Sequence, residues 1–521
     1  MKVAPNGKWR VSSRDFFKTL CEHCTRIDMA VAAGVPEAIE KVTPHKVDVS
    51  SLLWVMQGNE FERHIFDEIK STLREDFVEL AKPTMEQTLE LLRAGTPVVA
   101  QGYLESDSPE YFWSGFPDLL LREDLSFIDG KIAQISEPSS QPKYVVWDVK
   151  GTSSPDPKYW MQVASYAEIL ATHGLASEND LGLIAKNGLT LRNSLTSSIA
   201  QLDEARNVLK QRLAKVTPST ITVDFIQGWR CEKPSVCDRK KMCCDYPGLC
   251  EQVREEEHSL HCLYGKNPVE KYEDAGVATY DDLLALEVAP AGIAASAFAQ
   301  HQTWARVLKE EILNGPAYEL TPRDSWLSIP TPTPDDMFFD IEWFNPVLTQ
   351  GANVFMFGFV DSDEKFTSFD SLDEAEELAN FQKFVSVAKA KMESNPNAHI
   401  YHFFSPEVEH TRKLAAKYEQ LGEEVEFLIS RMVDLCDVSK SMLYPGANSY
   451  SIKALERYYD ADTKLNRKVN LVAGGADAML LYYKATVIDT VNANRHMDII
   501  RDYNKDDCLS TKLLRDWLRS L

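Results

Sequence analysis

The sequence predicts an α/β protein of several domains. Its 521 residues, 44% of them hydrophobic, can bury substantial cores, and the length indicates about three domains. In both halves of the chain, apolar runs of strand length alternate with amphipathic stretches of helix length. A mostly helical stretch over residues 269–313 separates the halves. We therefore expect two α/β domains joined by a helical connector.

The N-terminal half predicts two strands that each adjoin an aspartate. Residues 119–121 form an apolar run directly after Asp118, and residues 144–147 form another directly before Asp148. Because side chains alternate along a strand, Asp148 and Lys150 share a face. Two carboxylates on neighbouring strands can hold a metal ion while the lysine polarises a water or a phosphate. Alternating charges on a solvated face are the other explanation of Asp-x-Lys.

This layout resembles the PD-(D/E)XK nucleases, and in particular their RecB-like members. Those nucleases carry a glutamine and a tyrosine on the next helix, as this chain does at Gln162 and Tyr166 within the expected helix 160–170. The resemblance implies that Asp118 and Asp148 bind metal. It also implies that both aspartates are catalytic, together with Lys150, Gln162 and Tyr166.

The segment 57–64 resembles the first helix motif of these nucleases. Members often have a metal-contacting histidine where this chain has Phe61. Glu62 or His64 is the expected substitute, and a solvated helix face is the alternative for either residue.

Cysteines cluster at the end of this half. Five of ten lie at positions 231, 237, 243, 244 and 250, and two more lie at 21 and 24. The arrangement resembles that of RecB-like nucleases with an iron-sulfur cluster. The resemblance implies a [4Fe-4S] cluster, with zinc as the competitor, on Cys21, Cys231, Cys237 and Cys243, with Cys250 or Cys24 as replacements. A disulfide framework is the alternative, although intracellular cysteines are normally reduced.

The connector is expected over residues 266–320. Within it, residues 272–284 predict a helix, a glycine turn and a helix. The pattern resembles a helix-hairpin-helix element, which can present backbone N–H groups to a phosphate, and a packed helical hairpin is the alternative. Four prolines then predict a linker over 321–336. We therefore divide the chain into domains at 1–265, 266–320 and 321–521.

The C-terminal domain predicts a further alternation of strands and helices. The expected strands are 337–342, 353–361 and 399–404, and the expected helices are 374–391 and 498–521.

Four side chains of this domain can converge on one phosphate. Asp340 and Glu342 share a strand face, and Tyr503 and Asp507 share a helix face. Two divalent ions about 4 Å apart can neutralise a scissile phosphate and activate a water. Carboxylate oxygens suit Mg²⁺ or Mn²⁺ for this task. For the Asp-x-Glu tripeptide taken alone, the alternative explanation is a strand end that is exposed to solvent.

The strings FDIE at 339–342 and YNKDDCLSTKLLRDWL at 503–518 together resemble the DEDDy branch of the RNase H-like 3'-5' exonucleases. They are most similar to the predicted RecB-family nucleases with a YprB-like exonuclease domain at the C-terminus. Further matching segments follow in order at 401–407, 433–435, 450–456 and 507–511. The resemblance implies an RNase H-like mixed sheet with flanking helices. It also implies that Asp340, Glu342 and Asp507 are metal ligands and that Tyr503 orients the attacking water.

The second motif departs from that branch. Its members usually have Asn-x-x-Phe-Asp, whereas this chain offers Glu407 at the matching place and Glu409 two residues later. We assign Glu407 as the catalytic residue of this second motif. Asp434 is the alternative, and a polar helix start explains Asp434 equally well.

Composition sets further limits. The formal charge of −23 is unusual for a nucleic-acid-binding protein, and bound metal or basic patches at 239–241 and 412–413 would have to compensate. A solvated face is the alternative for each patch. No apolar run approaches the roughly 20 residues that cross a bilayer, and no signal-peptide pattern opens the chain, so we expect a cytoplasmic protein without membrane contact. No Gly-x-x-x-x-Gly-Lys-[Ser/Thr] loop occurs, so a helicase partner would have to supply any ATPase activity.

Three hypotheses follow. The first is a nuclease that uses both sites on single-stranded DNA or DNA ends, for instance in DNA repair. The second is an RNA-processing exonuclease in which only the C-terminal site is active. The third is a non-catalytic nucleic-acid-binding scaffold.

Overall fold

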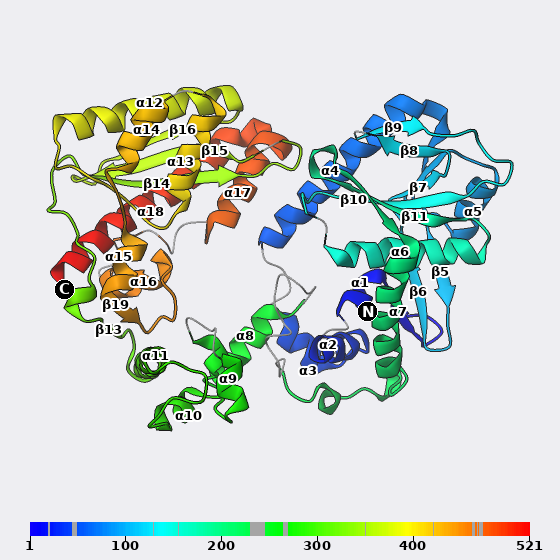
Figure 1. Cartoon of the computed structure of the whole chain (residues 1–521), viewed down its shortest axis with the longest axis horizontal. Helices are drawn as coiled ribbons and strands as arrows, with labels where there is room; N and C mark the ends of the chain where they lie inside the picture. The colour runs from blue at the N-terminus through cyan, green and yellow to red at the C-terminus, as the bar shows by residue number, and fades with distance from the viewer. Residues whose placement is uncertain are drawn as a thin grey trace. The chain divides into compact units, whose positions relative to one another are not determined.

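The protein forms two compact units. The structure is a computed structural model that describes all residues except 19–20, 44–48, 129, 155, 230–244, 264–268, 350, 420, 461–463, 466 and 468–471. The first unit comprises residues 1–254 and 347–350, and the second comprises residues 255–346 and 351–521 (Figure 1). The sequence-based boundaries at 265 and 320 stay predictions. Within the described chain, no helix combines the length and apolarity needed to cross a membrane.

A six-stranded mixed sheet forms the centre of the first unit, in the order β12-β11-β10-β7-β4-β3. In chain order its strands are Phe77–Glu79 (β3), Val98–Ala100 (β4), Leu119–Arg122 (β7), Tyr144–Lys150 (β10), Ala176–Ala185 (β11) and Thr190–Ser194 (β12). Strand β10 lies between β7, to which it is antiparallel, and β11, to which it is parallel. It is buried from Tyr144 to Val149, as a central strand covered on both faces should be. The two predicted strands are therefore present.

Helices and smaller sheets surround this sheet. Helix α6 (Pro157–Thr172) begins with Asp156 as its N-cap and Pro157 in its first turn, and it contains the expected helix 160–170. A four-stranded sheet combines Lys2–Val3 (β1), Trp9–Val11 (β2), Tyr111–Gly115 (β6) and Leu104–Asp107 (β5), and a hairpin combines Leu125–Ile128 (β8) with Lys131–Gln134 (β9). The other helices are Ser13–Phe17 (α1), Glu22–Ala32 (α2), Pro36–Val42 (α3), Val49–Leu73 (α4), Met85–Arg93 (α5), Leu195–Leu213 (α7) and Pro247–Glu256 (α8).

The second unit opens with three helices, which are Val269–Asp274 (α9), Tyr280–Ala285 (α10) and Ala295–Asn314 (α11). Gly276 has a positive φ of 78° in the turn after α9, and Thr279 caps α10 through the backbone N–H of Asp282. The predicted helix, glycine turn and helix are therefore observed. Residues 321–336 contain a single 3₁₀ turn at Arg323–Ser325 and no other regular element, as four prolines would require.

A five-stranded mixed sheet follows, in the order β16-β15-β14-β17-β18. Its strands are Met337–Phe344 (β14), Asn353–Asp361 (β15), Phe366–Asp370 (β16), Ile400–His402 (β17) and Met432–Asp434 (β18). Strand β14 is antiparallel to β15 and parallel to β17. A two-stranded sheet pairs Tyr318–Leu320 (β13) with Leu443–Pro445 (β19). The helices are Glu374–Ser394 (α12), Pro406–Lys417 (α13), Gly422–Ile429 (α14), Leu435–Met442 (α15), Ile452–Tyr459 (α16), Gly475–Tyr483 (α17) and Ala493–Ser520 (α18).

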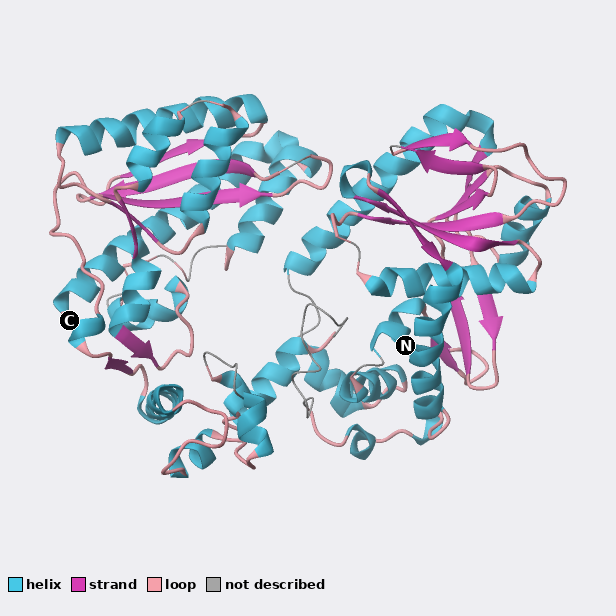
Figure 2. Cartoon of the chain, in the orientation of Figure 1, coloured by secondary structure: helices cyan, strands magenta, loops and turns pink. Residues whose placement is uncertain are grey.

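The two faces of β14 have different neighbours. Met337, Phe339 and Ile341 pack in one apolar cluster with side chains of α12, α13 and α14. Phe338 packs in another cluster with side chains of α15, α16 and α18. Helices α12 and α18 accordingly lie on opposite sides of the sheet (Figure 2). By alternation, Asp340 and Glu342 lie on the same face as Phe338, toward α18.

Candidate active site

Asp340, Glu342 and Asp507 form a compact acidic cluster in the second unit. One carboxylate oxygen of each lies within 4.8 Å of the others. Within the described part of the chain, they are the only group of at least three His, Cys, Asp or Glu side chains close enough to share a metal ion. The donors are all hard carboxylate oxygens, which Mg²⁺ and Mn²⁺ prefer.

The electrostatics of the cluster favour a bound cation. Burial raises the pKa of Asp340 well above its ordinary value, and the charges of Glu342, Asp507 and Glu407 raise it further. Burial, followed by the charge of Asp507, likewise raises the pKa of Glu342. A divalent ion would remove this repulsion and keep the carboxylates ionised, so the residues present fit such an ion.

Asn504 supports the cluster from α18. Its Nδ2 donates to Asp340 Oδ2 at 2.7 Å and is 3.4 Å from Glu342 Oε1. Gly358 lies directly across from Asp340 in the β14–β15 pairing. A Cβ atom on Gly358 would come within 1.7 Å of Asn504 Oδ1, so the missing side chain makes room for this amide. Sequence reasoning missed Asn504, although it is three residues before Asp507 on the same helix.

Tyr503 is buried beside the carboxylates. Lys453 Nζ donates to its hydroxyl at 3.2 Å. Burial, followed by the charge of Asp507, raises the pKa of Tyr503, so the phenol keeps its proton and can donate a hydrogen bond. The structure thus brings together Asp340, Glu342, Tyr503 and Asp507, which the sequence placed in one site.

Glu407 also belongs to this neighbourhood. It is buried at the start of α13, its Oε2 is 3.5 Å from His402 Nδ1, and its charge contributes to the raised pKa values of Asp340 and Glu342. Burial raises the pKa of Glu407 itself. Glu409 is instead exposed and pairs with Lys413.

Asp434 has a structural role. Its Oδ1 accepts from the backbone N–H of Cys436 at 2.8 Å and from that of Phe404 at 2.9 Å. It therefore caps α15 and holds the loop that precedes α13. Of the two explanations that the sequence left open, the polar helix start accounts for these contacts.

Residues 337–519 match the family model described as RNase H superfamily. The C-terminal part of the chain is an RNase H-like domain. Such a domain indicates a nuclease, that is, a hydrolase that binds and cleaves nucleic acid with the help of divalent metal. No curated protein and no solved structure matches the chain.

The first unit holds a second cluster of charged groups. Asp118 Oδ2 accepts from the backbone N–H of Val149 at 2.7 Å, and Lys150 Nζ lies 2.5 Å from Asp148 Oδ2. Gln162 Nε2 donates to Asp148 Oδ1 at 3.4 Å. Burial and the charge of Asp148 raise the pKa of Asp118 well above its ordinary value.

Tyr166 and Glu62 complete this cluster, and Phe61 and His64 do not. Burial and the charges of Asp148 and Asp118 raise the pKa of Tyr166. Burial raises the pKa of Glu62, whose charge interacts with Lys150 and Asp148 and whose carboxylate accepts from Gln101 at 2.5 Å. Phe61 is packed in an apolar core, whereas His64 is exposed near Glu68.

The expected iron-sulfur site lies largely outside the described residues, which exclude Cys231, Cys237, Cys243 and Cys244. Cys21, Cys24 and Cys250 are buried, and Cys21 caps α2 by accepting from the backbone N–H of Cys24 at 3.4 Å. The cluster and its zinc alternative stay predictions.

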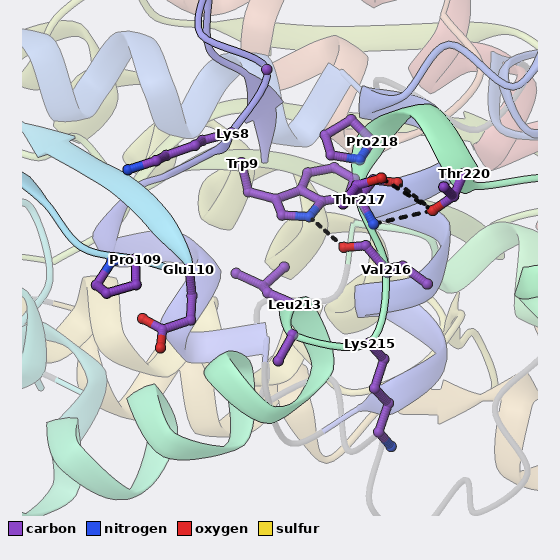
Figure 3. Close-up of a pocket in the computed structure, with 12 residues that line it drawn as sticks. Lys8, Trp9, Pro109, Glu110, Leu213, Lys215, Val216, Thr217, Pro218 and Thr220 are labelled. Atoms are coloured by element: carbon purple, nitrogen blue, oxygen red, sulfur yellow. Dashed lines mark hydrogen bonds between the residues drawn. The ribbon is translucent and has the colours of Figure 1, made fainter.

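A cavity of about 480 Å³ opens elsewhere in the first unit, between β2 and the end of α7. Trp9 lines it and donates from Nε1 to the carbonyl of Val216 at 3.2 Å (Figure 3). None of the predicted site residues lines this cavity.

Proposed function

We propose that the protein is a metal-dependent 3'-5' exonuclease that acts on DNA through the C-terminal site. The observation that supports this proposal best is the convergence of Asp340, Glu342 and Asp507 within 4.8 Å in an RNase H-like domain. The presence of Glu407 and Tyr503 beside them agrees with the DEDDy resemblance, from which the 3'-5' polarity is taken. DNA, as single strands or ends, is proposed as the substrate.

Each side chain has a distinct task in this proposal. Bound divalent ions would neutralise the scissile phosphate and lower the pKa of the attacking water. Asp340, Glu342 and Asp507 hold those ions, with Glu407 as the fourth carboxylate. The Asn504 amide fixes the orientation of Asp340 through its 2.7 Å hydrogen bond. The protonated Tyr503 hydroxyl orients the water.

We further propose that the first unit carries a second, RecB-like nuclease site. The charges of Glu62, Asp118, Asp148 and Lys150 interact with one another there. Asp118 and Asp148 would hold the metal, and Glu62 stands in for the missing histidine. Gln162 donates a hydrogen bond from its amide to Asp148. Lys150 supplies a positive charge for a phosphate.

Degradation of end-labelled single-stranded DNA and RNA in Mn²⁺ tests both proposals. Wild type is compared with Asp340→Asn, Asp118→Asn and the double variant. Partial activity in each single variant and none in the double variant is expected if both sites cut. Loss of all activity in Asp340→Asn would mean that only the C-terminal site cuts nucleic acid in the wild-type protein. Preferential cleavage of RNA would support the RNA-processing hypothesis. An inert wild-type protein would support the scaffold.

A further inference from the structure

Arg467 contacts the acidic cluster although none of the sequence motifs includes it. Its guanidinium donates through Nη2 to Asp507 Oδ1 and, at 2.6 Å, to Glu456 Oε1. Its Nε also donates to Glu456 Oε1, at 3.2 Å. The third nitrogen, Nη1, is buried and has no hydrogen-bond partner among the described residues. A buried, charged N–H group without an acceptor is costly, so this group indicates an acceptor that is still to arrive.

A second cation, Lys453, accompanies Arg467. The Arg467 guanidinium carbon is 5.9 Å from the centre of the Tyr503 ring, and Lys453 Nζ is 4.7 Å from it. Tyr503 is also the proposed water-orienting residue. The cluster therefore has carboxylates for metal ions and, next to them, two positive charges for an anion.

Glu456 gives Arg467 a fixed anchor that does not depend on the metal site. Besides Arg467, Glu456 Oε1 accepts from Ser510 Oγ at 2.8 Å. Asp507, in contrast, is one of the three carboxylates that would ligate a metal ion. A divalent ion bound to Asp507 competes with the guanidinium for the same charge, whereas the pair with Glu456 can persist.

We propose that Arg467 binds a substrate phosphate, and that Asp507 takes the place of this phosphate while metal is absent. This inference rests on the proposed exonuclease function of the same site. Arg467 then exchanges one anionic partner for another, because a bidentate guanidinium suits a phosphate as well as a carboxylate.

Two binding measurements on the full chain test the proposal. Mn²⁺ affinity is measured by calorimetry without nucleic acid, and single-stranded DNA affinity is measured in Ca²⁺. For Arg467→Gln we expect Mn²⁺ to bind about threefold to tenfold tighter, because a competing cation is gone. We expect DNA to bind about tenfold weaker or more, because a charge-assisted hydrogen bond is lost.

Arg457→Gln is the matched control. Arg457 lies on α16 near Glu456, but it is half-exposed and pairs with Glu311. Its substitution should leave both affinities unchanged. Arg467→Lys provides a second variant that keeps the charge, and we expect near-normal Mn²⁺ affinity with weakened DNA binding.

The opposite signs of the two changes separate the proposal from a merely structural role. If Arg467 only supports the site, both affinities fall in both Arg467 variants, and the proposal is wrong. Asp340→Asn tests the underlying function independently. If it leaves Mn²⁺ binding unchanged, the metal site itself is absent, whatever the Arg467 variants do.

Discussion

At the scale of single residues, Gly358 and Asn504 show how a missing side chain on one element shapes the site on another. Residues directly opposite in an antiparallel pair share a face, so a side chain at Gly358 would stand beside Asp340. The buried Asn504 amide occupies that space and links Asp340 to α18. The orientation of a carboxylate on β14 therefore depends on the residue at one position of β15.

We expect Gly358→Ala to lower nuclease activity about tenfold or more, because the new Cβ displaces the Asn504 amide and releases Asp340. Activity and Mn²⁺ affinity should fall together. Gly422→Ala is the control, since a Cβ there meets nothing within 4 Å. The double variant Gly358→Ala/Asn504→Ala should be no less active than Asn504→Ala alone, and full additivity of the two effects would contradict this account.

The buried carboxylates also predict how stability depends on pH without metal. The pKa of Asp340 is higher in the folded protein than its ordinary value, so the folded state holds this proton more tightly than the unfolded chain. The contribution of Asp340 to the free energy of unfolding is present at low pH. It is lost as the pH rises from the ordinary pKa range of a carboxylic acid through the raised pKa of Asp340 in the folded protein. In EDTA, the Tm of wild type should fall over this window.

Asp340→Asn removes the part of this pH dependence that Asp340 contributes. At about pH 8 in EDTA we expect the variant to melt at least about 2 °C above wild type, whereas added Mn²⁺ should stabilise wild type more than the variant. Calorimetric scans at several pH values measure both effects. Asp363→Asn, which replaces an exposed carboxylate, should behave as wild type does. Identical pH profiles for wild type and Asp340→Asn would contradict the raised pKa.

At the scale of elements, hydrophobic patterning predicts most of the C-terminal fold. The apolar run over 353–361 coincides with β15. The predicted helix over 374–391 is observed as α12, which ends slightly later, at Ser394. The last helix begins at Ala493 instead of Asp498, because Met497 already packs in the core. The expected strand 399–404 shortens to β17, since Phe404 turns to a positive φ of 78°.

The supporting side chains could not be predicted in the same way. Periodicity shows that Asp340 and Glu342 share a strand face, because side chains two residues apart on a strand lie on the same face. Asn504 and Arg467 acquire their roles from tertiary contacts with residues more than 30 positions away, such as Asp340 and Asp507. No local pattern encodes such a contact. Glu62 was only one of two candidates until the fold turned His64 toward solvent.

Asp434 holds the loop between β17 and α13, and Glu407 lies at the start of α13. We expect their substitutions to differ in their effect on activity. Asp434→Asn keeps an oxygen that can cap α15 and hold Phe404, so activity should stay within about threefold of wild type. Asp434→Ala should cost about 1 kcal/mol of stability. Glu407→Gln should lose about a hundredfold in activity or more, because it removes the proposed fourth carboxylate of the metal site. Activity assays and thermal unfolding compare the three variants, and equal losses in Asp434→Asn and Glu407→Gln would make Asp434 a ligand.

At the scale of the whole molecule, the two units each bury a group of carboxylates, and the chain carries a formal charge of −23. Such a molecule repels nucleic acid at long range. Attraction must then come from bound metal and from a few cations at the site, such as Arg467 and Lys453. This differs from a protein with an extended basic surface.

The salt dependence of binding measures how many cations take part. For single strands, the slope of log K against log salt is about −0.7 for each neutralised phosphate. With two cations at the site, we expect a slope of about −1.4 for single-stranded DNA in Ca²⁺. Arg467→Gln should reduce its magnitude by about 0.7, while Arg457→Gln leaves it unchanged. A wild-type slope of about −4 or steeper would instead require several further phosphate contacts. Because the charge of the whole chain works against binding, those contacts would have to lie on a local basic surface remote from the acidic cluster, and the nucleic acid would then be held chiefly outside the site that cuts it.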